Sequence, residues 1–212
     1  MTSQTITFAL YLAIAVLPSV AVHEYAEARA AGRLGDPSPR RWGRLTLDPR
    51  PHIDRFGTVV LPALLLLLIA VGVPAIPFAY AKPLPLEPSY LRRPDRDDVL
   101  VALAGPFANL AVAAVAGILV RFLGGEAQRF VIAVLYFNAI LFVFNLLPIP
   151  GLDGARILAR YLHGRAKEVY VDFAQYLPLV LIVVFFVFGG PILGIVNIVA
   201  GSLCTSLSAG RC

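Results

Sequence analysis

Long apolar stretches, separated by short charged segments, dominate the hydropathy pattern of this chain. Five of them contain no Lys, Arg, Asp or Glu: residues 1–22, 56–81, 99–120, 130–152 and 173–210. A helix needs about 20 residues, at a rise of about 1.5 Å each, to cross a hydrocarbon core about 30 Å thick. Each stretch reaches that length, so the pattern predicts an all-α polytopic membrane protein with about four to six transmembrane or re-entrant helices.

The first 57 residues show two different patterns. Residues 6–28 are predicted to form a helix that begins apolar and becomes polar over its last turns. We expect a retained span rather than a signal peptide, because residues 1–5 contain no Lys or Arg. Residues 30–57 are rich in Arg, Gly, Pro and Asp, and the alternation in Arg44-Leu45-Thr46-Leu47-Asp48 predicts a small β-hairpin or edge strand near the membrane surface.

Residues 58–81 form either a broken span or a re-entrant segment, because helix-breaking residues interrupt their apolar run. These are Pro62, Gly72, Pro74 and Pro77.

The distribution of basic residues favours re-entry. If the segment enters and returns, segments 29–55, 82–97 and 155–170 share one face of the membrane. They contain seven, four and four Lys and Arg, fifteen together, against two in segment 121–129 on the other face. A full crossing would leave no such bias. The positive-inside rule therefore predicts an N-terminus outside and three basic segments in the cytoplasm.

Residues 99–121 and 130–150 are predicted to form a helical hairpin around the polar turn 124–128. The last run, 173–210, is too long for one span, and Gly189-Gly190-Pro191 interrupts it. A kinked span followed by a tail and a second hairpin both fit this pattern.

One membrane-embedded domain is expected over residues 1–212, with a core at about 6–165 and a C-terminal apolar segment at 173–204. A composition of 58% hydrophobic and 15% charged residues, with a mean hydropathy of +0.78, excludes a soluble protein. The net charge of +5 is explained by the basic segments between spans, so no nucleic-acid partner is expected. Cys204 and Cys212 make neither a disulfide framework nor a cysteine metal cluster, and whether they pair stays open.

The polar end of the first helix carries candidate chemistry. His23 and Glu27 are four residues apart, so both can reach one ion on the same helix face, and Glu24 lies beside them. The layout is that of the zinc-hydrolase helix H-E-x-x-H, in which the two outer residues hold the metal and the Glu activates water. Ionisable groups in an apolar helix are costly, which favours a functional role.

Asp153 is the candidate for a third metal ligand. It follows a charge-free run of 23 residues, and Pro148, Pro150 and Gly151 turn the chain just before it. A catalytic zinc needs three protein ligands and an open fourth position. The alternative is that Asp153 caps a following helix at 155–163.

Four ordered segments resemble the site-2 protease family of intramembrane zinc metalloproteases (peptidase M50-like), in particular its small bacterial branch without a PDZ domain. The resemblance covers most of the chain, from about Val20 to about Leu158. The segments are His23-Glu24-Tyr25-Ala26-Glu27-Ala28 running on to Leu34-Gly35-Asp36; residues 43–49 with His52-Ile53-Asp54; residues 81–85 followed by 104–109; and residues 145–154.

The resemblance implies a metalloprotease with one zinc ion per chain, bound by His23 and Asp153. It assigns Glu24 as the general base and implies cleavage of a peptide bond in or near a substrate's transmembrane helix. The expected partners are a transmembrane protein substrate and the lipid bilayer, and the expected location is the bacterial inner membrane, as a multi-pass protein. The oligomeric state and the substrate stay open.

Glu27 departs from the family pattern, which has a second histidine there. A carboxylate can bind zinc through oxygen, so a site of His23, Glu27 and Asp153 is chemically possible. Such a site with Zn²⁺ sums to zero charge, whereas two histidines and one aspartate leave +1, so water and the scissile carbonyl are activated less. His52 is an alternative ligand, if its loop folds back; otherwise it is a surface histidine.

Two amides in apolar spans, Asn109 and Asn145, are predicted to bind the substrate backbone or the developing oxyanion, or else to bond between helices. Lys82-Pro83-Leu84-Pro85 is predicted to be extended and to offer an edge to which substrate adds.

The leading prediction is therefore a zinc-dependent intramembrane endopeptidase. The alternative is a catalytically weak or inactive relative that binds transmembrane helices, motivated by Glu27. A third reading is a transporter that uses the buried carboxylates as relay groups.

Overall fold

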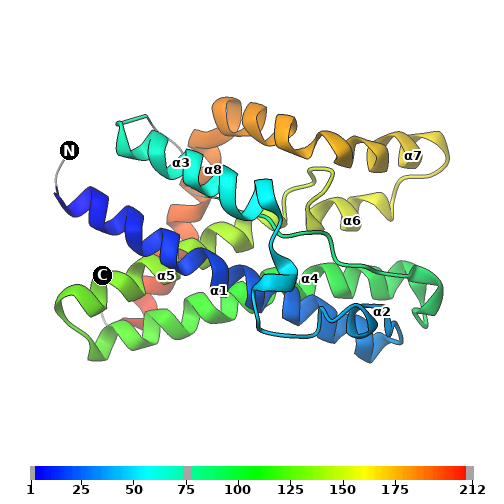
Figure 1. Ribbon diagram of the computed structural model, residues 1–212, viewed down its shortest axis with the longest axis horizontal. Coiled ribbons are helices and arrows are strands. Elements are labelled where there is room, and N and C mark those ends of the chain that lie inside the picture. The colour runs from blue at the N-terminus through cyan, green and yellow to red at the C-terminus, as the bar shows by residue number, and fades with distance from the viewer. Residues whose placement is uncertain (1–2, 74–77, 209–212) are drawn as a thin grey trace.

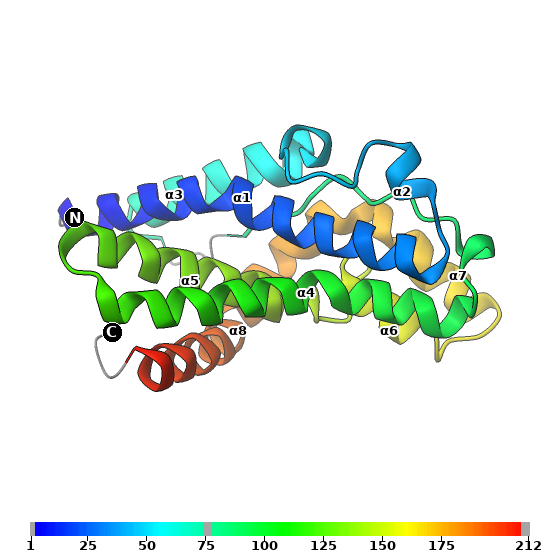
Figure 2. The same cartoon turned by 90° about the horizontal axis from the view of Figure 1, so that it is seen from below.

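Three long helices form the centre of the molecule in the computed structural model, which describes residues 3–73 and 78–208. They are α1 (Ser3–Leu34), α4 (Pro94–Leu119) and α5 (Gly125–Asn145). Each packs against the other two (Figure 1), and Figure 2 shows them side by side. Their buried residues include small side chains such as Ala102 and Ala139, aliphatic ones such as Leu135, and the aromatic Phe137.

Helices α1 and α4 are longer than the apolar pattern predicts. Helix α1 continues six residues past 28 because Ala and Arg, good helix formers, fill its last turns. It ends before Gly35, whose φ of +117° suits glycine. Helix α4 begins at Pro94, and the side chain of Asp97 accepts a hydrogen bond from the Arg93 backbone N–H at 2.9 Å.

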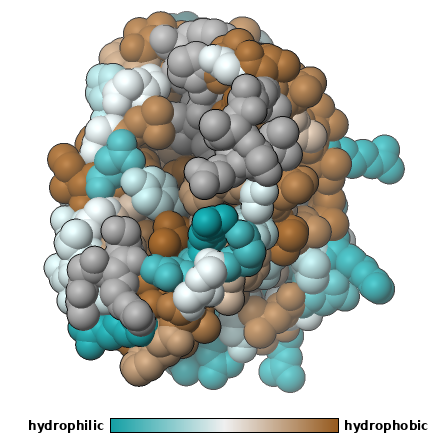
Figure 3. Space-filling view, turned by 90° about the vertical axis from the view of Figure 1, so that its left-hand side faces the viewer, coloured by the Kyte–Doolittle hydropathy of each residue, from teal (hydrophilic) through white to brown (hydrophobic). Residues whose placement is uncertain are grey.

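The predicted hairpin of the second half is confirmed. Helix α4 passes through η4 (Val120–Phe122) into α5. This end of the molecule, where α1 also begins, shows hydrophilic patches between hydrophobic ones (Figure 3). Glu126 lies here, and it accepts hydrogen bonds from Tyr11 and from Arg129.

The chain that leaves residue 54 returns to the same place by residues 80–82. Its helical part consists of η2 (Arg55–Val60), a π-helical turn, and α3 (Leu61–Ala70), which packs on α1. The returning chain bonds to the place where the segment began, because the Tyr80 N–H donates to Gly57 O at 3.1 Å and the Lys82 N–H donates to His52 O at 2.9 Å. Both ends of the segment therefore lie together, which is the arrangement expected for re-entry.

The β-hairpin predicted within 30–57 is not confirmed, because the part of the chain that the structure describes contains no β-strand. This region holds α2 (Ser38–Arg41), η1 (Arg50–His52) and irregular chain, and η3 (Pro88–Tyr90) follows later. Burial does not alternate over 44–48: Arg44 is buried, whereas Leu47 is 58% exposed. The Arg44 guanidinium bonds to Pro51 O and to Lys82 O.

The C-terminal third begins with two short helices, α6 (Asp153–Ala159) and α7 (Arg165–Asp172). It continues through η5 (Phe173–Tyr176) into α8 (Leu177–Leu207), which contains Pro191. Figure 1 shows α8 bent, with its orange and red halves running in different directions. The run is therefore one kinked helix rather than a hairpin. The pairing of Cys204 with Cys212 lies outside the described residues.

Within residues 3–73 and 78–208, three helices are long and apolar enough to cross a membrane: Pro94–Phe122, Gly125–Asn145 and Val187–Leu207. The apolar helix Arg55–Ile69 is shorter. The all-helical fold and these apolar helices agree with a membrane protein. The domain boundaries of the sequence analysis stay a prediction.

Candidate metal centre

The last turns of α1 carry three buried ionisable side chains. His23, Glu24 and Glu27 are 7%, 6% and 3% exposed. The four-residue spacing places His23 and Glu27 on one face of the helix. Buried charge of this kind is stable only when it is paired or holds a metal.

Asp153 is brought to the same place by the turn before α6. It is the first residue of that helix, and Leu152 is the N-cap residue, without a side-chain cap hydrogen bond. The capping role considered for Asp153 is therefore not observed. A Cβ at Gly154 would overlap the backbone carbonyls of Leu146 and Leu147, so glycine is required where the helix begins.

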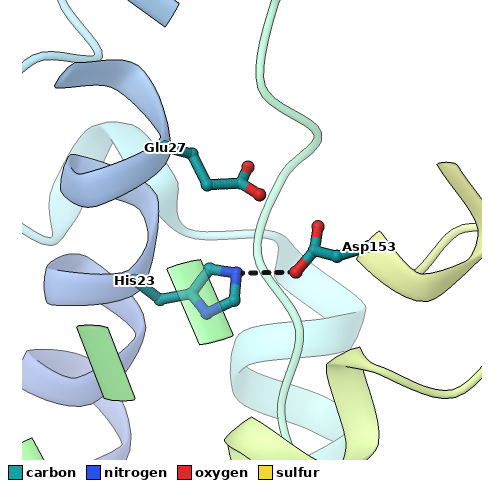
Figure 4. Close-up of side chains that lie close together, drawn as sticks. All are labelled: His23, Glu27 and Asp153. Atoms are coloured by element: carbon teal, nitrogen blue, oxygen red, sulfur yellow. Dashed lines mark ion pairs between the residues drawn. The ribbon is translucent and has the colours of Figure 1, made fainter. Parts of the chain in front are cut away.

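The side chains of His23, Glu27 and Asp153 point toward one another (Figure 4). One ligand atom of each lies within 4.8 Å of the others, and His23 Nε2 is 3.1 Å from Asp153 Oδ2. Three donors around a tetrahedral zinc, at about 2.1 Å from the ion, would be about 3.4 Å apart. Small side-chain rotations close that difference.

Two of these atoms have no hydrogen-bond partner among the described residues. Glu27 Oε1 and Asp153 Oδ2 are both buried without one, and the 3.1 Å approach of His23 Nε2 does not have hydrogen-bond geometry. Buried oxygen atoms are rarely left unsatisfied. One nitrogen and two oxygen donors are a ligand set that zinc accepts, so the residues present fit this ion.

Asn109 fixes the imidazole of His23. Its Oδ1 lies 2.7 Å from His23 Nδ1, and its Nδ2 donates to Ser19 O and to Asn138 Oδ1. The amide oxygen can only accept, so Nδ1 carries the proton and Nε2 presents a lone pair toward Asp153. Such bonds to the second ring nitrogen orient histidine ligands.

Of the two roles considered for Asn109, the structure shows the hydrogen bond between helices and not the contact with substrate. Its side chain is fully buried and does not line the cavity described below, so it does not face a substrate. Asn145 does line the cavity, and its Nδ2 donates to Leu141 O of its own helix at 2.9 Å.

Gly105 makes room for the ring of His23. A Cβ at this position of α4 would overlap Nε2 and Cε1 of the imidazole. Gly105 and the following Pro106 both lie inside α4. The side chain that packs closely against Gly105 is the metal-ligand candidate His23.

Glu24 forms an ion pair with a buried arginine. Arg44 NH2 lies 3.1 Å from Glu24 Oε2 and also donates to Lys82 O, while NH1 donates to Pro51 O at 2.9 Å. Arg44 is only 4% exposed. It therefore links the predicted general base to both neighbouring loops.

His52 lies beside Glu24 rather than in the ligand group. It is 1% exposed, not a surface residue, and its Nδ1 is 3.9 Å from Glu24 Oε2. Burial lowers the pKa of His52, so the neutral ring donates from Nε2 to Thr46 O at 2.9 Å. The structure thus does not bring His52 to Asp153 as an alternative ligand.

A cavity of about 550 Å³ opens beside this group. His23, Glu24, Glu27 and Asp153 lie on one side of it, and apolar residues of the extended segment 79–86 lie on the other. Water and a peptide chain could both enter such a space.

Several residues of the site escaped sequence reasoning. Asn138 carries the same signal as Asn109, an amide in an apolar helix, and could have been found from it. Arg44 and Arg156 gave no such signal, because arginines in basic loops are usually solvated. Ser19 is too common a residue in helices to stand out.

Comparison with known proteins gives consistent results. The model of "Peptidase family M50" matches residues 123–189. The "Putative zinc metalloprotease YwhC" of Bacillus subtilis (strain 168) is 36% identical over 160 residues, which are 70% of this chain and 67% of that protein. The "Putative zinc metalloprotease Rip2" of Mycobacterium tuberculosis (strain ATCC 25618 / H37Rv) is 32% identical over 173 residues, 80% of this chain and 64% of that protein.

A third relative, Rip2 of Mycolicibacterium smegmatis, is 30% identical over 171 residues, 79% of this chain and 63% of that protein. The chain thus spans about two thirds of the length of these relatives. No solved structure matches it. On the strength of these relatives and of the family model, the chain belongs to the site-2 protease family, peptidase family M50.

Proposed function

We propose that this protein is a zinc-dependent endopeptidase that cleaves peptide bonds in or beside transmembrane helices. The observation that carries the proposal is the convergence of His23, Glu27 and Asp153, buried and with unsatisfied oxygen atoms, at a cavity that Glu24 also lines. We take one zinc per chain as the cofactor and the bacterial inner membrane as the location.

The chain's own residues supply the acid–base chemistry. Glu24 accepts a proton from the attacking water and returns it to the leaving amine. Arg44 holds the Glu24 carboxylate in place by the contact at 3.1 Å. A zinc ion at the ligand group would act as a Lewis acid toward the water and the scissile carbonyl.

The extended segment after α3 supplies a place for the substrate backbone. The backbone groups of Tyr80 and Lys82 bond to the 52–58 region and to Arg44. In an extended chain alternate residues point their N–H and C=O groups to opposite sides. Ala81 therefore points these groups the other way, and it lines the cavity. A locally unwound substrate can add there as a strand.

Two variants test the proposal by separating binding from chemistry. Metal content and cleavage are measured for detergent-purified wild type, Asp153→Ala and Glu24→Gln, after removal of any metal-binding tag. The probe is a set of synthetic peptides, each with an apolar helix of about 20 residues, with products identified by mass spectrometry. We expect about one zinc in wild type and in Glu24→Gln, with turnover only in wild type, and neither in Asp153→Ala.

The controls are Asp95→Ala and Glu168→Gln, which remove exposed carboxylates of the same types. Both should keep zinc and turnover. Glu27 in place of histidine motivates a second candidate, a non-catalytic protein that binds transmembrane helices. Zinc bound without turnover in wild type would favour this candidate. Absence of zinc from wild type would contradict the proposal itself.

A further inference from the structure

Arg156 reaches into the ligand group from the same helix as Asp153. It lies three residues later in α6, one turn along the same face. Its NH1 is 3.5 Å from Glu27 Oε1, and its NH2 contacts Oδ1 and the backbone O of Asp98 in α4. The guanidinium is therefore held between α1 and α4 at the edge of the cavity.

The three buried carboxylates of the site each face a different nitrogen-bearing side chain. Glu24 faces Arg44 and Asp153 faces the His23 ring. The remaining carboxylate, Glu27, is 96% buried as a side chain, being 4% exposed, and faces Arg156. A carboxylate in such surroundings needs a charged or hydrogen-bonding partner, and Arg156 is the cation nearest to Oε1.

The contact leaves Glu27 free to bind an ion. At 3.5 Å it is an ion pair rather than a hydrogen bond, and Oε1 has no hydrogen-bond partner among the described residues. Asp98 takes the close contact with the guanidinium, and its side chain is 29% exposed. Water screens the charge of Asp98 more than that of Glu27. Asp98 therefore does not fully neutralise the positive charge that the Arg156 guanidinium presents to Glu27.

We propose that Arg156 is the positioning residue that allows a glutamate at position 27 to serve as a metal ligand. It holds the Glu27 carboxylate toward His23 and Asp153, and it restores the positive charge that a glutamate in place of histidine removes from the centre. With Zn²⁺, His23, Glu27, Asp153 and Arg156 sum to +1, the value for two histidines and one aspartate. This inference rests on the proposed zinc site.

A double-mutant cycle tests the link between Arg156 and Glu27. Zinc affinity is measured by competition with a chromophoric chelator for wild type, Arg156→Gln, Glu27→His and the double variant. Thermal unfolding of each metal-free protein is followed in parallel. We expect Arg156→Gln to weaken zinc binding about tenfold or more in the wild-type background and less than about threefold beside Glu27→His, where the ligand is neutral.

The Tm of the metal-free proteins should show the same coupling. Arg156→Gln should lower the Tm in the wild-type background but not in the Glu27→His background. Arg160→Gln, on the exposed end of α6, is the matched control and should change neither quantity. If Arg156→Gln does not fold, Arg156→Lys keeps the charge without the planar fork and should retain most of the affinity.

The outcomes separate the two proposals. Equal losses in both backgrounds, or no loss in either, would overturn the role of Arg156 while the zinc site stands. A wild type that binds no zinc would overturn the proposed function and this inference together.

Discussion

The imidazole of His23 is oriented by two residues of α4 that offer no charge of their own. Asn109 Oδ1 accepts a hydrogen bond from the Nδ1–H group, and Gly105 leaves the space that the ring fills. Both lie on one face of the helix, four residues apart. The metal-ligand candidate of α1 therefore depends on a helix that contributes no ligand.

Replacing Gly105 by alanine is expected to displace the His23 ring. The new Cβ would overlap Nε2, the atom with the lone pair for the metal. Zinc affinity, measured by chelator competition, should fall about tenfold or more, because small displacements of a ligand are costly. The preference of alanine over glycine in a helix, about 1 kcal/mol, offsets part of the cost of this overlap to folding.

Gly32→Ala is the control for that substitution. Gly32 also lies in a helix, α1, but a Cβ there would meet nothing within 4 Å. It should keep full zinc binding and raise the Tm slightly. Undiminished zinc affinity in Gly105→Ala would show that the ring does not occupy this space when the metal is bound.

Ligand candidates were predictable at this scale, but their supporting residues were not. His23, Glu27 and Asp153 stood out because each is ionisable beside or within an apolar run, which is costly unless the group has a use. Arg44 and Arg156 were hidden among eighteen basic residues. Only tertiary contacts distinguish a buried arginine from a solvated one.

At the scale of elements, extended chain with backbone bonds along one side occurs after residue 78 and not at 44–48, where the sequence predicted a strand. Its Tyr80 and Lys82 bond on one side to the 52–58 region, and the close approach depends on Gly57, where a Cβ would overlap the Tyr80 ring. The sequence predicted extended chain here from its prolines. It placed the hairpin earlier, at 44–48, because a period-two pattern of residue types over five residues does not by itself show that a strand forms.

Ala81→Pro should separate substrate binding from metal binding. Proline removes the N–H that we propose to face the substrate, while its φ suits an extended chain and Tyr80 before it is already extended. Zinc content should stay at the wild-type value, and kcat/KM for helix peptides should fall about tenfold or more. That loss is the expected cost of one or two backbone bonds to the substrate.

Ala81→Ser keeps the backbone N–H and is the matched control. It should retain most of the cleavage activity. Equal activity of the proline and serine variants would mean that substrate does not add to this segment, and that the cavity recognises side chains instead.

At the scale of the whole molecule, two segments rich in Lys and Arg lie in contact with each other. The hydrogen bond from the Tyr80 N–H to Gly57 O brings these two positions together. Arg92 N–H also donates to Leu34 O, so the basic segments 29–55 and 82–97 meet. The helical hairpin followed directly from the apolar pattern, whereas the length of α8 did not, because proline can bend a helix without ending it.

The same grouping of charge predicts how the molecule sits in a membrane. Segments 29–55, 82–97 and 155–170 should lie in the cytoplasm, and the α4–α5 turn should lie outside, because Lys and Arg stay on the cytoplasmic face. Fusions after Arg93 and after Gly124 test this with two reporters, a fluorescent protein active only in the cytoplasm and a phosphatase active only outside. The Arg93 fusion should fluoresce, and the Gly124 fusion should show phosphatase activity. Phosphatase activity after Arg93 would mean that residues 58–81 cross the membrane fully, and the metal site would then open to the opposite side.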